Sequence, residues 1–149
     1  MEAWRITRAR KPAEAFSGEG ARIFGGRWNS PGIRLIYTAG TRSLAILEIL
    51  AHLTKAAPLD NYVLFRVECD DSLVQIVSDL PPGWNSEPPT AASQSVGDAW
   101  VRSATHPALS APSAIVPEER NYLLNPAHPE FSRIVIGRPA TYRIGPRLL

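Results

Sequence analysis

Hydrophobic residues dominate the stretch 44–53, "LAILEILAHL", in which eight of ten positions are apolar. The wider segment "TRSLAILEILAHLTK" (41–55) is predicted to be a helix, with Thr41 or Ser43 available to cap its N-terminus. Glu48 stands in the middle of the apolar run, where an unpaired carboxylate would be costly to bury. We therefore expect Glu48 either to reach water or a nearby arginine at the edge of the helix, or to serve a ligand site.

Strand patterns occur in several other segments. "NYVLFRVEC" (61–69) alternates apolar and polar residues in part and gives the strongest of these predictions. Further strands are predicted at residues 3–6, 34–39, 73–77, 114–116, 132–137 and 140–145. A second, short helix is predicted over "VGDAWVRSATH" (96–106).

Glycine and proline mark the irregular parts of the chain. Residues 13–26 are Gly-rich and weakly patterned, which predicts a loop. "LPPGWNSEPPT" (80–90) holds four prolines, and residues 107–131 alternate prolines with short apolar pieces, which predicts long non-helical passages. Strands outnumber the interspersed helices, so we predict one α+β domain over residues 1–149 with a mixed or antiparallel sheet.

Composition and length fit a single soluble globular domain. The 149 residues are 44% hydrophobic and 20% charged, and no apolar stretch reaches the roughly 20 residues that span a bilayer. The N-terminus shows no secretory signal, so a cytoplasmic location and no membrane contact are expected. A single cysteine, Cys69, cannot form an internal disulfide, and the three histidines lack metal-ligand spacing, so no metal is expected.

Basic residues are concentrated in the first part of the chain. Residues 1–55 carry nine basic and four acidic side chains, whereas residues 56–149 carry seven and ten. The pI near 9.0 leaves open a non-catalytic basic module, for example one that binds nucleic acid. Lys and Arg do not gather in one helix or stripe, and aromatic residues are not interleaved with them. Direct nucleic-acid binding is therefore not expected.

"GGRWNSPG" (25–32) is the first candidate for ligand chemistry. Its two glycines permit a close approach of the backbone to a ligand, and Arg27 follows them directly. Backbone N–H groups and a guanidinium could together bind a pyrophosphate. The same segment could equally be a turn whose Trp28 fills the core.

Three polar or aromatic side chains add to this picture. Tyr37 precedes the predicted Glu48 helix and could stack on a flat heterocycle or belong to the core. Ser113 and Asn121 lie in a proline-rich apolar passage, where each needs a hydrogen-bond partner. A bound ligand is one such partner.

Taken together, these segments resemble the RES domain, the toxin half of bacterial RES–Xre toxin–antitoxin modules. The arginine, glutamate and serine for which that family is named correspond to Arg27 in "GGRWNSPG", Glu48 in "SLAILEIL" and Ser113 in "PSAIVPEERNYLLNP". The resemblance runs from "WRI" through "LPPGW" and "GDAW" to "RLL", so it covers essentially the whole chain.

The resemblance implies a fold similar to that of ADP-ribosyltransferase toxins and NAD⁺ as the substrate. Family members break the nicotinamide–ribose bond and pass ADP-ribose to water or phosphate, which depletes NAD⁺ and stops growth, while others modify a protein. The partner is an Xre-like helix-turn-helix antitoxin that blocks the active site, and a homodimer is expected.

The resemblance also assigns roles to individual residues. Glu48 would stabilise an oxocarbenium-like transition state. Arg27, with Arg5 in second place, would bind the pyrophosphate, and Tyr37 would stack on nicotinamide or its ribose. Ser113 would orient Glu48 or the ribose hydroxyls, with Asn121 as a weaker support.

Overall fold

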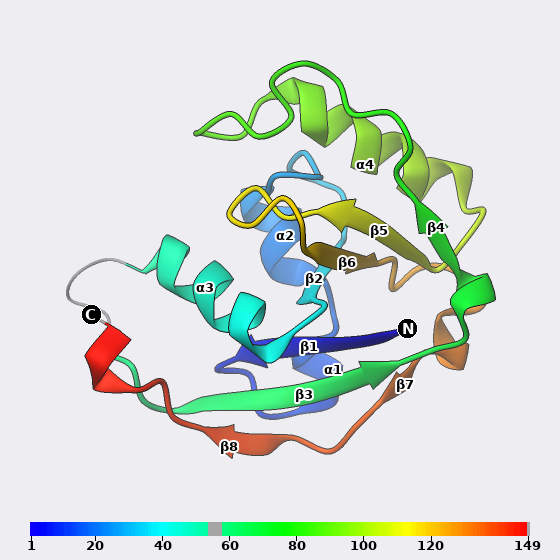
Figure 1. The fold of residues 1–149 in the computed structure, drawn as a ribbon. Coiled ribbons are helices and arrows are strands. Elements are labelled where there is room, and N and C mark those ends of the chain that lie inside the picture. Colours follow the sequence, from blue (N-terminus) through cyan, green and yellow to red (C-terminus); the bar gives the residue numbers. More distant parts are fainter. Residues whose placement is uncertain (54–57, 149) are drawn as a thin grey trace.

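One mixed sheet of eight strands organises the protein (Figure 1). The computed structural model describes residues 1–53 and 58–148. The strands are β1 (Glu2–Thr7), β2 (Ile36–Ala39), β3 (Tyr62–Glu68), β4 (Val74–Ile76), β5 (Ala108–Pro112), β6 (Arg120–Leu124), β7 (Val135–Ile136) and β8 (Ala140–Tyr142). The helices are α1 (Pro12–Ala15), α2 (Glu19–Phe24), α3 (Arg42–His52) and α4 (Ala91–Ser103). Three short 3₁₀ turns cover Asp71–Leu73, Phe131–Arg133 and Pro146–Leu148. The predicted α+β class with a mixed sheet is confirmed.

The strand order is β4-β5-β6-β2-β1-β3-β7, and β8 also pairs with β3. Every pair is antiparallel except β4 with β5. β7 and β8 occupy different parts of the same edge, because β7 pairs near the end of β3 and β8 near its start. The central strands β6, β2 and β1 therefore bring residues from three distant parts of the sequence side by side.

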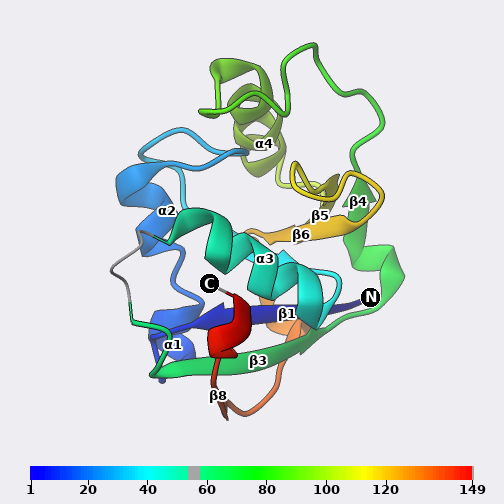
Figure 2. The ribbon, with the colours of Figure 1, turned by 60° about the vertical axis from the view of Figure 1, so that its left-hand side comes forward.

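Apolar side chains pack in three clusters on this sheet. Phe65 and Ile36 belong to the first cluster, which also covers α1. The second lies beneath α3 and contains Trp4 and Leu44. The third joins α4 to β5 and β6. Figures 1 and 2 show β5 and β6 between α4 and α3, with β1 and β3 beyond α3. No helix in residues 1–53 or 58–148 is long and apolar enough to cross a bilayer.

The predicted helix that carries Glu48 is α3. Thr41 caps it by accepting a 3.0 Å hydrogen bond from the backbone N–H of Leu44, so Thr41 and not Ser43 fills that role. The helix ends at His52, and residues 54–55 of the prediction lie outside the described residues. Leu44 and Ala45 are buried, whereas Glu48 is half-buried because it faces a cavity instead of closed core.

The prediction of a loop over residues 13–26 is wrong. Pro12 opens the one-turn helix α1, where its fixed φ suits the first helical position. Gly18, at φ 71°, turns the chain into α2, and Arg22 pairs with Glu19 within that helix. Helices of four and six residues are too short to show a helical repeat in the sequence.

The predicted strand at residues 114–116 is also wrong. Two strands flank this segment, and residues 113–119 form the turn of the β5–β6 hairpin. The Ser113 hydroxyl accepts the backbone N–H groups of Ile115 and Val116, so those donors are not offered to a neighbouring strand. Residues 107–131 contain no α-helix, as predicted, although Phe131 begins a 3₁₀ turn. The two strands of the hairpin were not predicted, because prolines flank them.

The remaining boundaries differ by a few residues. The helix predicted over 96–106 begins earlier, at Ala91, where Thr90 caps it, and ends at Ser103. The strands predicted at 34–39, 73–77, 132–137 and 140–145 are present in shortened form. Residues 80–90 contain neither helix nor strand, which confirms the effect expected of four prolines.

Candidate active site

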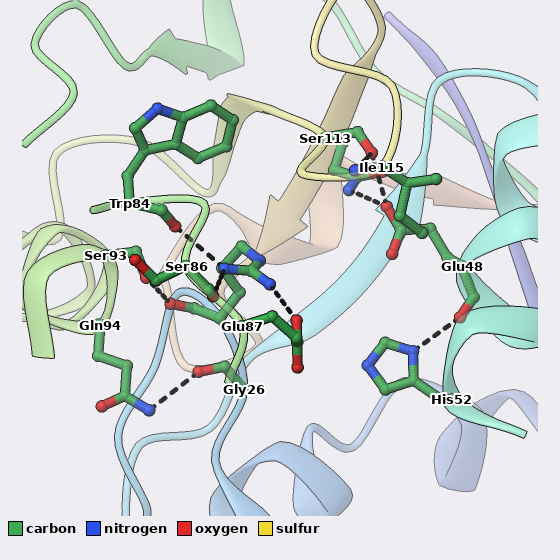
Figure 3. A network of polar contacts seen from close by, with 12 residues as sticks. Gly26, Glu48, His52, Trp84, Ser86, Glu87, Ser93, Gln94, Ser113 and Ile115 are labelled. Carbon is green, nitrogen blue, oxygen red and sulfur yellow. Dashed lines mark hydrogen bonds and ion pairs between the residues drawn. The ribbon is translucent and has the colours of Figure 1, made fainter. Parts of the chain in front are cut away.

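A cavity of about 750 Å³ opens between α3 and the segments that carry Arg27. Its lining comes from β1, α2, residues 25–28, β2, α3, residues 87–94, residues 114–115 and β6. Arg5, Arg27, Tyr37, Glu48 and Asn121, all expected from the sequence to serve the site, line this cavity. Figure 3 shows Glu48 and His52 on one side of the cavity and Gly26, Glu87 and Gln94 on the other.

The Glu48 carboxylate is held through one of its two oxygens. Oε1 accepts hydrogen bonds from Ser113 Oγ at 3.0 Å and from Asn121 Nδ2 at 2.7 Å. Oε2 has no hydrogen bond to any residue that the structure describes. Two donors on Oε1 fix the plane of the carboxylate, so Oε2 remains available to a ligand in the cavity.

Ser113 contacts Glu48 but does not line the cavity. Its side chain is fully buried, and Oγ accepts the N–H groups of Ile115 and Val116 at 3.0 and 3.2 Å. The hydroxyl proton is donated to Glu48 Oε1. A serine with both acceptor positions and its proton so engaged is not arranged to act as a nucleophile. Of the two roles expected for Ser113, the contacts favour the orientation of Glu48.

Asn121 leaves one buried acceptor without a donor. β6 pairs with β2 so that Asn121 lies opposite Ala39 and faces the cavity. Its Nδ2 is committed to Glu48, and its Oδ1 is buried with no hydrogen bond to the described residues. An unsatisfied buried acceptor costs about 1–3 kcal/mol. Because Asn121 lines the cavity, a water or a ligand in the cavity can donate to this oxygen.

Tyr37 anchors the turn that carries Arg27. The two hydrogens of Asn29 Nδ2 are shared among three carbonyls, those of Ala21, Ser30 and Ile33. The other amide atom, Oδ1, accepts from the Tyr37 hydroxyl at 2.7 Å. The same hydroxyl accepts the backbone N–H of Trp28 at 3.0 Å. Burial raises the pKa of Tyr37, so the hydroxyl stays protonated at neutral pH. The ring of Tyr37 lines the cavity, while its hydroxyl is hydrogen-bonded to Trp28 and Asn29.

α4 holds the other side of that turn. Ser93 Oγ donates to the Arg27 carbonyl at 2.6 Å, and Gln94 Nε2 donates to the Gly26 carbonyl at 3.1 Å. One turn further along, Asp98 accepts from both the backbone N–H and the hydroxyl of Ser30. A Cβ on Gly97 would overlap the backbone oxygen of Trp28. The packing therefore requires glycine at position 97.

The two arginines of the cavity are engaged differently. Arg27 Nη1 donates to the carbonyls of Trp84 and Ser86, and Nη2 donates to Glu87 at 2.9 Å. Arg5 donates through Nε to the Ala15 carbonyl and through Nη1 to the Tyr37 carbonyl. Burial lowers the pKa of Arg5 to about 10, which leaves it charged at neutral pH.

Sequence reasoning did not assign His52, Glu87 or Gln94 to the site, although all three line it. His52 could have been found, because it lies four residues after Glu48 on the same helix face. Its Nδ1 donates to the Glu48 backbone carbonyl at 2.7 Å, which leaves Nε2 directed away from the helix. Glu87 and Gln94 carry no local signal, since they reach the site through contacts 60 and 68 residues distant. Among the described residues, no group of three or more His, Cys, Asp or Glu could hold a metal ion.

A family model described as "RES domain" matches residues 2–144 of this chain. The chain belongs to the RES domain family. A "Toxin Res" of Yersinia enterocolitica is 37% identical to this RES domain over 151 residues, which cover 99% of each chain. A "Prs ADP-ribosylating toxin" of a Sphingobium species is 40% identical over 154 residues, 98% of this chain and 95% of that protein.

The fold of the RES domain is also found in a solved structure. A chain in the crystal structure of the M. tuberculosis MbcT–MbcA toxin–antitoxin complex superposes with a TM-score of 0.76. The superposition covers 95% of this RES domain and 84% of that chain, at 21% sequence identity. At this identity the two proteins share a fold.

Proposed function

We propose that this RES domain is the toxin of a toxin–antitoxin pair and that it cleaves the bond between nicotinamide and ribose in NAD⁺. The observation that carries the proposal is the placement of Glu48, oriented by Ser113 and Asn121, in the same cavity as Arg5 and Arg27. The cavity volume of about 750 Å³ lies in the range of about 300–1,000 Å³ common for small-molecule sites. The names of its relatives in Yersinia and Sphingobium agree with a toxin.

The chemistry requires a carboxylate but no general acid. When the C1′–N bond breaks, its electron pair moves to the pyridinium nitrogen, and nicotinamide leaves as a neutral molecule. Positive charge then develops on the ribose, and Glu48 stabilises it as carboxylates do in glycoside hydrolysis. An acceptor oxygen bonds to C1′, and a water acceptor releases its proton to solvent or to a nearby base. The guanidinium groups of Arg5 and Arg27 supply the positive charge that a pyrophosphate needs.

Two acceptors are distinguished by experiment. Transfer to water or phosphate gives ADP-ribose or its phosphate ester and depletes NAD⁺. Transfer to a protein is the alternative, and the name of the Sphingobium relative favours it. Incubation with labelled NAD⁺ and a cell lysate separates the two outcomes, since protein modification places the label on a polypeptide.

The direct test is mass spectrometry of the products after purified protein is mixed with NAD⁺, with and without phosphate. We expect loss of NAD⁺ and release of nicotinamide by the wild type, and at least a hundredfold slower loss by Glu48→Gln. Glu130→Gln is the matched control, because Glu130 is an exposed glutamate outside the cavity. Wild-type turnover by Glu48→Gln would contradict the assignment of Glu48.

A toxin of this kind acts on the NAD⁺ pool of the cytoplasm and needs a partner that keeps it inactive. We expect that partner to be an Xre-like helix-turn-helix antitoxin that covers the cavity. We also expect a homodimer. Co-expression with the neighbouring gene product and light scattering of the purified complex test both expectations.

A further inference from the structure

All hydrogen bonds of the Arg27 guanidinium to the described residues go to one segment of the chain, residues 84–87. Nη1 donates to the carbonyls of Trp84 at 3.1 Å and Ser86 at 2.9 Å, which uses both of its hydrogens. Nη2 donates to Glu87 Oε2 at 2.9 Å. The indole of Trp84 stacks on Trp28, with ring centroids 5.9 Å apart, and fixes the segment against the Arg27 turn. Figure 3 shows Trp84, Ser86 and Glu87 across from Glu48.

The contacts of Arg27 differ in how readily a ligand could replace them. The two carbonyl contacts belong to the backbone of a segment held by the stacked indoles. The Glu87 contact belongs to a side chain that is 79% exposed, whereas the Arg27 side chain is 15% exposed. On the Nε–Nη2 edge, Nε has no hydrogen bond to the described residues, and Nη2 has one, to Glu87. That edge of a guanidinium binds phosphate oxygens in a bidentate manner. A phosphate on this edge would compete with Glu87 and leave both carbonyl contacts in place.

The charges of the side chains that line the cavity also indicate that Glu87 competes with an anionic ligand. The charged side chains that line the cavity are Arg5 and Arg27 against Glu48 and Glu87, so their formal charges cancel. Glu48 is held away from Arg27 by Ser113 and Asn121, so Glu87 is the acid that neutralises Arg27. A pyrophosphate that approaches the Arg27 guanidinium would therefore be repelled by the Glu87 carboxylate bound to it.

We propose that Glu87 is a displaceable counter-ion of Arg27 that sets the affinity of the cavity for anionic ligands. A ligand with a pyrophosphate displaces the carboxylate, and the exposed Glu87 side chain moves into solvent. A neutral nucleoside cannot displace it, so Glu87 makes the site selective for ligands that carry the phosphates. The inference rests on the proposed function, because it takes the cavity to bind a dinucleotide.

The test measures binding without turnover. Isothermal titration with ADP-ribose, which has already lost nicotinamide, and with inorganic pyrophosphate is performed on the wild type and on Glu87→Gln. Glutamine keeps the shape of the side chain and removes its charge. We expect Glu87→Gln to bind both probes about five- to twentyfold more tightly and to bind adenosine no better than the wild type does. Glu130→Gln is the control, because Glu130 also forms an exposed ion pair with an arginine, Arg133, outside the cavity.

The outcomes separate the two proposals. Unchanged or weaker pyrophosphate binding by Glu87→Gln, or no pyrophosphate binding by any variant, would overturn the counter-ion role. Equal tightening by Glu130→Gln would overturn it too, because the effect would then follow net charge alone. Tighter pyrophosphate binding in Glu87→Gln supports the counter-ion role even where NAD⁺ is not consumed. A wild type that fails to consume NAD⁺ would instead remove the proposed reaction.

Discussion

The side-chain amide of Asn121 donates to Oε1 of Glu48 over 2.7 Å, although 73 residues separate the two in the chain. The contact joins α3 to β6, where Asn121 pairs with Ala39 of β2. It positions the carboxylate from the sheet side, while Ser113 positions it from the hairpin turn.

Substitution of Asn121 by Asp tests whether the donor on Glu48 matters. Two carboxylates at hydrogen-bond distance cannot both ionise easily, so one of them acquires a raised pKa. At neutral pH we expect Asn121→Asp to consume NAD⁺ at least tenfold more slowly than the wild type. Below its raised pKa the new carboxyl carries a proton and can donate to Glu48 as the amide does. The rate relative to wild type should therefore rise as pH falls from 8 to 5. Asn121→Ala has no such donor, and recovery of that variant at low pH would contradict the explanation.

Ser113→Ala removes a positioning residue. A hydrogen bond to a charged group contributes about 1.5–3 kcal/mol, which corresponds to a roughly ten- to hundredfold loss in kcat if it is lost in the transition state. Ser113 also satisfies two buried N–H groups, so we expect a lower Tm in the same variant. Rapid-quench mass spectrometry of the wild type should detect no ADP-ribosyl group on Ser113. A trapped adduct there would make Ser113 a nucleophile.

Gly97→Ala should disturb the Arg27 turn from a distance. The added methyl group cannot coexist with the Trp28 carbonyl in its present place, so α4 and the turn must separate. Overpacking of this kind costs about 1–3 kcal/mol, or roughly 2–10 °C in Tm for a chain of this size. We expect a higher KM for NAD⁺ as well, because Arg27 moves with the turn. Gly145→Ala is the control, since nothing lies within 4 Å of a Cβ at that position.

Tyr37→Phe tests whether the Tyr37 hydroxyl contributes to stability or to turnover. Loss of the hydroxyl leaves the Trp28 N–H and Asn29 Oδ1 unpaired, so we expect about 1–3 kcal/mol of destabilisation, with KM affected more than kcat. The pKa of Tyr37 is raised from 10.0 in the folded protein. Above pH 10 the unfolded chain therefore releases a proton that the folded chain keeps, and the stability of the wild type falls. Urea unfolding at pH 8 and pH 11 should show a smaller fall for Tyr37→Phe. An equal fall in both proteins would contradict the burial of the hydroxyl.

Local patterns were sufficient for the elements that contribute most to the site. The apolar spacing of residues 44–52 and the cap at Thr41 are properties of adjacent residues, and both place Glu48 on α3. The alternation in residues 61–69 likewise predicted β3. Glu48, Arg27 and Asn121 could be singled out because a carboxylate, a guanidinium and an amide in apolar or Gly-rich surroundings need partners.

Contacts across the fold could not be read from the sequence. The ion pair of Arg27 with Glu87 depends on how residues 84–87 pack on Trp28, and no short-range pattern encodes that packing. The β5–β6 hairpin was missed because Pro112 ends one strand and Pro117 lies in the turn, where the sequence alone indicates irregular backbone. His52 is the exception, because its spacing of four residues from Glu48 on α3 already places both side chains on one helix face.

The β5–β6 hairpin follows α3 in the chain, which decides when the Glu48 carboxylate gains its two donors during synthesis. During synthesis α3 leaves the ribosome long before residues 113 and 121, so the nascent chain carries its carboxylate without either donor. Pairing of β6 with β2 is the event that supplies both. A truncated product that ends before this hairpin would lack both donors to Glu48, and we expect it to be harmless.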